Sequence, residues 1–219
     1  MIRGENIFSK TLPVANATLR PDMSSDGFTI FATTIGPSGI VWSDVGVLGV
    51  QLPEGRKDET RARVRQRFPD ARPRAPSPQI ARAVDAIVRL LRGEAADLSA
   101  IELDMSRVSP FHRRVYQAAR AIPRGRTLSY GELARRLGAP RSARAVGQAL
   151  GRNPFAIVVP CHRVISASGR AGGFSAHGGV ATKLRMLSIE CAALPEARVA
   201  PSIGRRPPAN ESRCCRPRR

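Results

Sequence analysis

The chain changes from strand-forming to helix-forming sequence near residue 108, and this change limits the fold more than any other feature. Residues 28–55, FTIFATTIGPSGIVWSDVGVLGVQLPEG, are rich in Ile, Val, Thr and Phe, which favour strands, and GPSG at 36–39 predicts a turn between two of them. Residues 109–152 carry apolar side chains at helical spacing instead. We therefore expect an α+β fold, in which a small N-terminal α/β domain precedes a mainly helical C-terminal domain.

The first half contains further elements at recognisable positions. ETRARVRQRF at 59–68 predicts a short basic helix, and PQIARAVDAIVRLLRGE at 78–94 predicts an amphipathic helix after a proline-rich link at 72–78. ADLSAIELDM at 96–105 alternates enough to predict a strand. The expected division of the chain is a loose extension at 1–26, the α/β domain at 27–107, the helical domain at 108–191 and a disordered Arg/Pro-rich tail at 192–219.

Capping residues delimit three helices in the second half. Ser109 and Pro110 suit the start of a helix that Pro123 and Gly125 stop. Ser129 with the glutamate three residues later predicts a capping box for a helix ending near residue 137. GAP at 138–140 breaks that helix, and another spans about 142–151. This pair of helices predicts a helix-turn-helix, although such pairs also occur as simple packing units.

The charge favours a polyanionic partner. The formal net charge is +19, and almost all the cations are arginines. Nucleic acid is the natural partner for such a chain, although GC-rich codons would also produce an arginine bias. The helix at 142–151 combines small residues, among them Ala143 and Gly147, with Arg141 and Arg144, so it could approach a phosphate backbone or enter a groove closely.

Several classes of protein are disfavoured. No stretch approaches the roughly 18 apolar residues of a membrane span, and the N-terminus lacks a secretory apolar core, so we expect a cytoplasmic protein with no membrane contact. The four cysteines show no paired CxxC spacing, which argues against a disulfide framework and against a zinc site. We expect no metal and no cofactor.

One cysteine stands in an unusual context. In NPFAIVVPCHRV at 153–164, FAIVV predicts a short buried strand, and Pro160 must end it because proline cannot donate to a ladder. Cys161 would then lie at the end of an element, with His162 beside it. A nearby imidazole favours the nucleophilic thiolate, directly if the backbone turns or through one water otherwise. An isolated Cys-His pair is also compatible with an ordinary buried cysteine.

Three longer stretches carry a resemblance to a known family. FHRRVYQAARAIPRGRTLSYGELARRLG, SARAVGQALGRNP and PCHRVISASGRAGGFSAHGGVATKLRMLSIE resemble, in order and spacing, the O6-alkylguanine-DNA alkyltransferases, also called methylated-DNA–protein-cysteine methyltransferases. The resemblance covers about Ser109 to Glu190. Residues 27–107 resemble the variable N-terminal domain of that family only loosely.

The resemblance implies roles for individual residues. Cys161 would accept the alkyl group, His162 would deprotonate it through a water, and Glu190 would orient and charge that histidine. Asn153 would brace the turn before the active site. Arg144 would fill the gap left by an extruded base, and the following residues would contact DNA or line the guanine pocket: Tyr130, Arg141, Ala143 and Gly147 on the DNA side, and Val159, Pro160, Val164 and Ser175 in the pocket.

The implied function is DNA repair. The alkyl group of O6-alkylguanine, with O4-alkylthymine as a further candidate, would pass irreversibly from double-stranded DNA to Cys161, once per monomeric protein and without a cofactor. The base must be flipped because O6 lies inside the stack. The rivals are a homologue that only marks lesions, which would lack the acceptor cysteine, a helix-turn-helix regulator, and a cysteine hydrolase that turns over repeatedly.

Three features depart from the family pattern. Cys191 follows Glu190 where the family often has glycine, His177 has no evident role, and the Arg/Pro tail lies outside the pattern. We expect the tail to add nonspecific affinity for DNA, since arginines neutralise phosphates.

Overall fold

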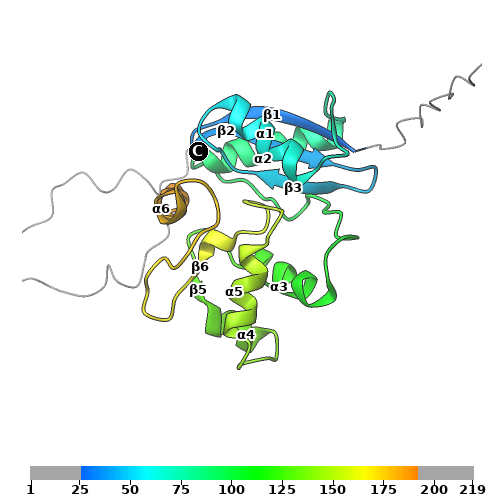
Figure 1. Cartoon of the computed structure of the whole chain (residues 1–219). Helices are drawn as coiled ribbons and strands as arrows, with labels where there is room; N and C mark the ends of the chain where they lie inside the picture. The colour runs from blue at the N-terminus through cyan, green and yellow to red at the C-terminus, as the bar shows by residue number, and fades with distance from the viewer. Residues whose placement is uncertain (1–25, 192–219) are drawn as a thin grey trace, which may run out of the picture.

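The chain adopts a mixed α/β fold in this computed structural model, which describes residues 26–191 (Figure 1). The predicted mixture of strands and helices is therefore confirmed, whereas the domain boundaries stay a prediction. The expectations for residues 1–25 and for the tail at 192–219 lie outside the described residues.

A four-stranded sheet forms the first half of the described chain, in the order β3-β2-β1-β4. Strands β1 (Gly27–Thr33), β2 (Gly36–Trp42) and β3 (Val47–Gln51) are antiparallel, and β4 (Arg72–Pro73) runs parallel to β1. This sheet is the platform on which both helices of the first half pack.

The turn between β1 and β2 is not where GPSG predicted it. It lies at residues 34–35, and Gly36 already pairs with Thr33 across the strands. Gly36 supplies the positive φ of 125° that closes the turn, and the Thr33 hydroxyl donates to its carbonyl at 2.6 Å. Pro37 is tolerated inside β2 because the pairing of β3 with β2 begins only at Gly39, so Pro37 has a strand neighbour on one side alone.

Two helices cover opposite faces of this sheet. Helix α1 (Lys57–Arg67) packs Val64 with Val41 on one face, and α2 (Pro78–Leu91) packs Ile87 with Ile40 on the other. Successive residues of a strand point to opposite faces, which is why Ile40 and Val41 belong to different clusters. Both helices were predicted, and the face under α2 continues into the core of the second half.

Residues 96–105 do not form the strand that their alternation predicted. Leu103 makes a single parallel bridge with Val47, and the Val47 N–H donates to the carbonyl of Glu102 at 2.9 Å. The chain then turns, because the Asp104 carboxylate accepts hydrogen bonds from the Ser106 N–H and the Ser43 hydroxyl. The segment covers the open edge of β3 instead of extending the sheet.

The second half is mainly helical, as expected. Helices α3 (Pro110–Arg120), α4 (Tyr130–Arg136) and α5 (Ala143–Gly151) pack on one another. The Ser129 hydroxyl accepts from the Glu132 N–H at 3.1 Å and the glutamate side chain accepts from the Ser129 N–H at 2.6 Å, so the predicted capping box is confirmed. Gly138, at φ 71°, makes the turn between α4 and α5.

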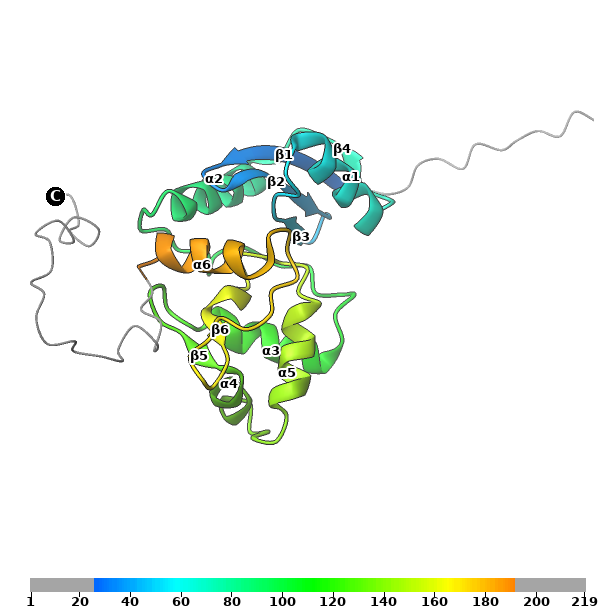
Figure 2. The same ribbon diagram turned by 60° about the vertical axis from the view of Figure 1, so that its left-hand side comes forward.

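The last elements join the two halves. A short parallel pair is formed by β5 (Leu128–Ser129) and β6 (Val164–Ile165), and α6 (Gly179–Ile189) lies between the sheet and helices α3–α5 (Figure 2). Arg124 donates to the carbonyl of Ile189 at 3.2 Å, and Arg185 donates to the carbonyl of Thr34. Helix α6 is thus tied both to the sheet and to the loop before β5.

The capping box permits a controlled test of the local fold. We expect Ser129→Ala to lower the free energy of unfolding by about 1 kcal/mol, because α4 loses an acceptor for a backbone N–H of its first turn. Urea denaturation measures this. Ser142→Ala is the matched control: Ser142 caps α5 without a side-chain hydrogen bond, so its loss should cost less than about 0.5 kcal/mol. Equal losses in the two variants would contradict the capping assignment.

Candidate active site

Cys161 begins a turn of 3₁₀ helix rather than ending a strand. Residues 155–159 are buried or half-buried, as predicted, but they form only isolated bridges. Ile157 adopts a left-handed conformation with φ 74°, and the Val159 N–H donates back to the carbonyl of Phe155 at 2.8 Å. The strand prediction was therefore wrong, because the chain folds back on itself and delivers Cys161 at the start of η1 (Cys161–Arg163).

Asn153 fixes the loop that precedes the cysteine. Its side-chain N–H donates to the carbonyl of Val159 at 2.9 Å, and its side-chain oxygen accepts from the Phe155 N–H at 2.9 Å. The loop is also fastened to the sheet, because the Val50 N–H donates to the carbonyl of Pro154 at 2.8 Å. One amide side chain thus takes over the bonds that a strand ladder would have made.

Behind the cysteine, a buried carboxylate collects an imidazole and a guanidinium. His162 is fully buried, and its Nε2 lies 3.0 Å from Oε1 of Glu190, which is 4% exposed. Arg163 donates to both oxygens of Glu190, at 2.8 and 2.9 Å, and also to the carbonyl of Ile122 at 2.5 Å. The network therefore holds together the end of α6, the η1 turn and the chain just after α3.

The charges of this network follow from burial. Although burial favours the neutral acid, hydrogen bonds from His162 and Arg163 hold the pKa of Glu190 at about 2, so it is a carboxylate. Burial lowers the pKa of His162 despite its contact with Glu190. The imidazole is thus neutral near pH 7, with Nε2–H donating to Glu190. Nδ1, which has no hydrogen-bond partner among the described residues, then keeps a free lone pair that can accept a proton.

The sulfur itself rests as a thiol. Burial raises the pKa of Cys161, although hydrogen bonding from the Asn153 side chain, the charge of Lys183 and backbone N–H groups of η1 lower it in part. These groups stabilise the thiolate once a proton leaves. The site therefore combines a protonated nucleophile with a neutral base and with groups ready to receive the negative charge.

Lys183 was not among the predicted site residues. It is fully buried in α6, donates from Nζ to the carbonyl of Val164 at 2.6 Å, and lies 5.9 Å from the ring centroid of Tyr130. Burial lowers the pKa of Lys183 to about 8, with the charge of Cys161 acting against that shift. One signal was present in the sequence: in an arginine-biased chain, the lysines are only Lys10, Lys57 and Lys183.

Two pockets meet at Cys161. The larger, of about 450 Å³, is lined by Tyr130, Gly147, Leu150, Gly151, Cys161, Gly173, Phe174 and Ser175. Gly147 lies beside Tyr130, because a Cβ added at Gly147 would stand 3.7 Å from the Tyr130 ring. The smaller, of about 190 Å³, shares Cys161, Phe174 and Ser175 and continues toward the sheet.

The structure brings most of the predicted site residues together. Cys161, His162, Glu190 and Asn153 form one contiguous site, and Tyr130, Gly147 and Ser175 line the larger pocket. Arg141 and Arg144 are exposed on the approach to α5 and in its first turn, and Ala143 is half-buried there.

The remaining pocket residues lie elsewhere. Val159 and Val164 are fully buried and do not line either pocket at Cys161, and Pro160 lines a separate pocket of about 170 Å³ beside Arg163. The side chains of Val159 and Val164 belong to the core cluster that α2 shares with the second half. Phe174 and Gly173 occupy the wall instead, and the sequence pattern did not indicate them. His177 lies in the same loop, 4.0 Å from Glu54 of the first half.

Residues 26–191 contain no group of three or more His, Cys, Asp or Glu side chains that could hold a metal ion. None of the helices in this part of the chain is both long and apolar enough to cross a membrane.

Comparison with known proteins places this geometry in context. Residues 110–192 match the model of the 6-O-methylguanine DNA methyltransferase DNA-binding domain. A methylated-DNA–protein-cysteine methyltransferase of Mycolicibacterium paratuberculosis is 51% identical over 108 residues, which are 49% of this chain and 63% of that protein. A protein of the same description from Methanothermobacter thermautotrophicus is 40% identical over 153 residues, 69% of this chain and 78% of the relative.

Two further matches extend over more of the relatives. A DNA base-flipping protein of Thermus thermophilus is 40% identical over 157 residues, 70% of this chain and 95% of that protein. Among solved structures, Mycobacterium tuberculosis OGT in complex with DNA superposes with a TM-score of 0.62 at 35% identity, covering 75% of this chain and 92% of the other. The likeness to solved structures therefore includes the sheet as well as the helices.

Protonation of Glu190 at low pH should lower the free energy of unfolding. Because its pKa is about 2 in the folded chain against an ordinary 4.5, the stabilisation is complete above pH 4.5 and is lost as the pH falls toward 2. The loss amounts to about 3 kcal/mol. Urea denaturation at a series of pH values measures it, with Glu190→Gln as the comparison. We expect the variant to be less stable at neutral pH and to approach the parent near pH 2; a constant difference would contradict the assignment.

Lys183 should control the acidity of the thiol. We expect Lys183→Met to slow alkylation of Cys161 by iodoacetamide below about pH 8, where the lysine carries its charge, because a cation that stabilises the thiolate is removed. Lys183→Arg keeps a cation and should slow the reaction less. Identical rates for Lys183→Met and the unaltered protein would show that the lysine serves only packing.

Proposed function

The chain belongs to the methylated-DNA–protein-cysteine methyltransferase family, and we propose that it repairs DNA by transferring the alkyl group of O6-alkylguanine to its own Cys161. The transfer is irreversible, so each molecule acts once. O4-alkylthymine is a further candidate substrate. One observation carries the proposal: a cysteine at the junction of two pockets stands next to a buried, neutral histidine held by a carboxylate.

The reaction is an in-line displacement at the alkyl carbon. Nδ1 of His162 takes the thiol proton through a bridging water, and Glu190 stabilises the imidazolium that forms. The sulfur then forms a bond to the alkyl carbon while the bond from that carbon to O6 breaks. The electron pair goes to the purine, which becomes guanine after taking a proton at N1. The product on the protein is a thioether, a group with no route back to a thiol.

Tyr130 and Ser175 suit a purine in the larger pocket. Burial, together with the charge of Cys161, raises the pKa of Tyr130, so its phenol stays protonated and can donate a hydrogen bond to a ring nitrogen or a phosphate. Ser175 offers a hydroxyl and a backbone N–H close to Cys161. These donors favour the electron-rich leaving purine over an apolar occupant.

We also propose that α4 and α5 act as a helix-turn-helix on double-stranded DNA. Arg141 and Arg144 are exposed at the start of α5, where Ala143 and Gly147 add little bulk. A helix of this kind can lie close to the minor groove while an arginine occupies the space of a flipped base. Flipping costs a few kcal/mol, which contacts of this sort must offset.

The organisation of the whole chain completes the proposal. The two domains are residues 27–107 and 108–191. In the second domain, Val159, Pro160 and Val164 support the pocket that receives the purine. The protein acts as a cytoplasmic monomer. The tail at 192–219 would add affinity for DNA without regard to sequence, because it is rich in arginine. Deleting the tail should then reduce the salt dependence of DNA binding.

A second candidate is a protein that flips and marks damaged bases without repairing them. The Thermus thermophilus relative described as a DNA base-flipping protein is the observation that favours it, whereas the presence of Cys161 argues against it. The two candidates share the DNA-binding surface and differ in chemistry alone, so a test of group transfer separates them.

Group transfer should be visible by mass. After incubation with duplex DNA containing O6-methylguanine, we expect the peptide that holds Cys161 to gain one methyl group per protein molecule. Cys161→Ser should gain none and still bind the DNA. Binding without methylation of the unaltered protein would favour the marking function, and repeated turnover would favour a hydrolase.

Arg144 should matter only where a base must be flipped. We expect Arg144→Ala to slow transfer from duplex DNA about tenfold or more, since the emptied stack loses the side chain that fills it, and to change transfer from a free O6-alkylguanine nucleoside less than about twofold. The matched control is Arg82→Ala on α2, which removes the same charge at a position far from the site in sequence and should leave both rates unchanged. Equal losses with both substrates would contradict the role in flipping.

A further inference from the structure

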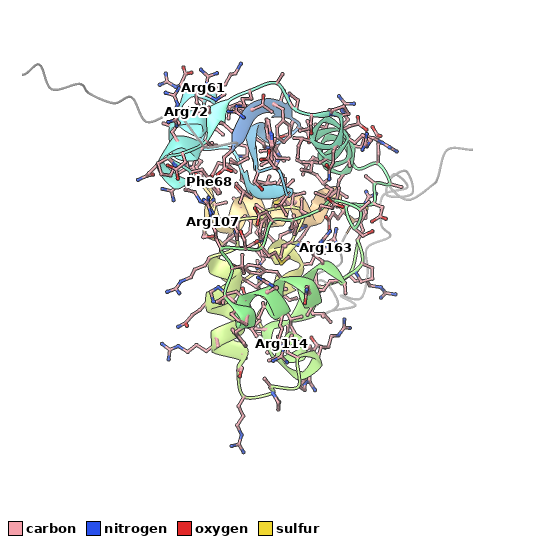
Figure 3. The ribbon with its side chains drawn as sticks, turned by 90° about the vertical axis from the view of Figure 1, so that its right-hand side faces the viewer. Arg61, Phe68, Arg72, Arg107, Arg114 and Arg163 are labelled. Carbon is pink, nitrogen blue, oxygen red and sulfur yellow. The ribbon has the colours of Figure 1, made fainter. Side chains whose placement is uncertain are left out.

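The smaller pocket at Cys161 has a distinct electrostatic character. Toward the sheet, its wall includes Arg63 and Arg67 from α1 and Arg152 at the end of α5. Figure 3 shows α1 with Arg61 on its outer part and Phe68 at the end nearest to the second half of the chain. The arginines that line the pocket therefore come from both halves and meet beside the reactive sulfur.

These cations exceed the negative charge around them. Glu54 is the only carboxylate among the residues that line this pocket. It already accepts a hydrogen bond from Gln51 at 2.8 Å and lies 3.8 Å from Arg63. Arg67 donates to the neutral oxygen of Gln51 at 2.9 Å rather than to a carboxylate. The pocket thus presents guanidinium groups with donors to spare, because a guanidinium carries five N–H groups.

The displacement geometry directs part of the substrate into this space. Sulfur, alkyl carbon and O6 must be collinear at the moment of transfer. With the purine in the larger pocket, any group beyond the first carbon projects to the side of that line. The larger pocket is filled by the base, so the smaller pocket, which shares Cys161, Phe174 and Ser175 with it, is the space available to that group.

We propose that Arg63, Arg67 and Arg152 form a subsite for the far end of the alkyl group and select adducts that end in an anion, such as O6-carboxymethylguanine. This inference rests on the proposed function of Cys161. The step is the same displacement: the sulfur bonds to the methylene carbon, the bond to O6 breaks, and its electron pair leaves with guanine, which gains a proton. The carboxylate remains on the protein as S-carboxymethylcysteine, beside the arginines.

The test compares substrates of equal size and different charge. O6-carboxymethylguanine and its neutral amide counterpart, O6-carbamoylmethylguanine, are placed in the same duplex beside O6-methylguanine as reference. Single-turnover rate constants are measured with the full chain, and the ratio of carboxymethyl to carbamoylmethyl is compared among variants. This comparison cancels the intrinsic difference in reactivity between the two groups.

We expect Arg67→Gln to lower that ratio about fivefold, the effect of removing one partly solvated charge pair, and Arg63→Gln with Arg67→Gln to lower it further. Arg67→Lys keeps the charge and should retain most of the ratio. Arg65→Gln is the matched control, because Arg65 is exposed on the same helix but does not line the pocket, and it should leave the ratio unchanged.

Three outcomes would overturn the subsite. The first is an unchanged ratio in the double variant. The second is an equal slowing of all three substrates, which would assign the arginines to DNA binding or folding. The third is that the unaltered protein accepts O6-methylguanine but not the carboxymethyl adduct. Failure to accept O6-methylguanine itself would instead refute the proposed function, so the two hypotheses fail in distinguishable ways.

Discussion

The rest of the site depends on the hydrogen bonds that His162 and Arg163 make to the buried carboxylate of Glu190. It is the shared acceptor for His162 and Arg163, and through Arg163 it is linked to the carbonyl of Ile122. Removing one partner of such a cluster leaves an uncompensated charge out of water, which costs several kcal/mol. The same contact keeps the imidazole in one tautomer. The Glu190 carboxylate therefore contributes both to the stability of the fold and to the reactivity of the site, so a substitution that breaks its contacts lowers both.

Local sequence signals predicted the helices well and the irregular segments poorly. The capping box at Ser129 and the apolar spacing of 78–94 depend on neighbours in sequence, and both were confirmed. The strands predicted at 96–105 and 155–159 were wrong, because Asp104 and Asn153 bind backbone groups and bend the chain. Alternating or apolar residues predict which side chains are buried. The direction of the backbone is determined here by polar side chains such as Asp104 and Asn153, which bind backbone groups.

The candidate site was predictable where a short motif holds it and not where distant segments build it. Cys161 and His162 are adjacent in sequence, and resemblance supplied Glu190, which the structure places against His162. Packing of α6 and of the first half brings Lys183 near Cys161 and places the arginines of α1 in the wall of the same pocket, and no local pattern encodes that packing. The rarity of lysine in an arginine-rich chain was the one usable hint to Lys183.

The way the edges of the sheet are covered determines whether the first half of the chain can remain unaggregated when it is separated from the second. Within residues 26–191, β3 is covered by Leu103 and Phe155, and the opposite edge, β4, is only two residues long and contains Pro73. Uncovered strands recruit one another, so these devices suppress aggregation. Residues 102–104 cover the Val47 end of β3, and the segment that leads to Cys161 covers the Val50 end, where the Val50 N–H donates to the carbonyl of Pro154. A first half severed from the second would leave the Val50 end of β3 unpaired, so this fragment should aggregate more readily than the intact chain.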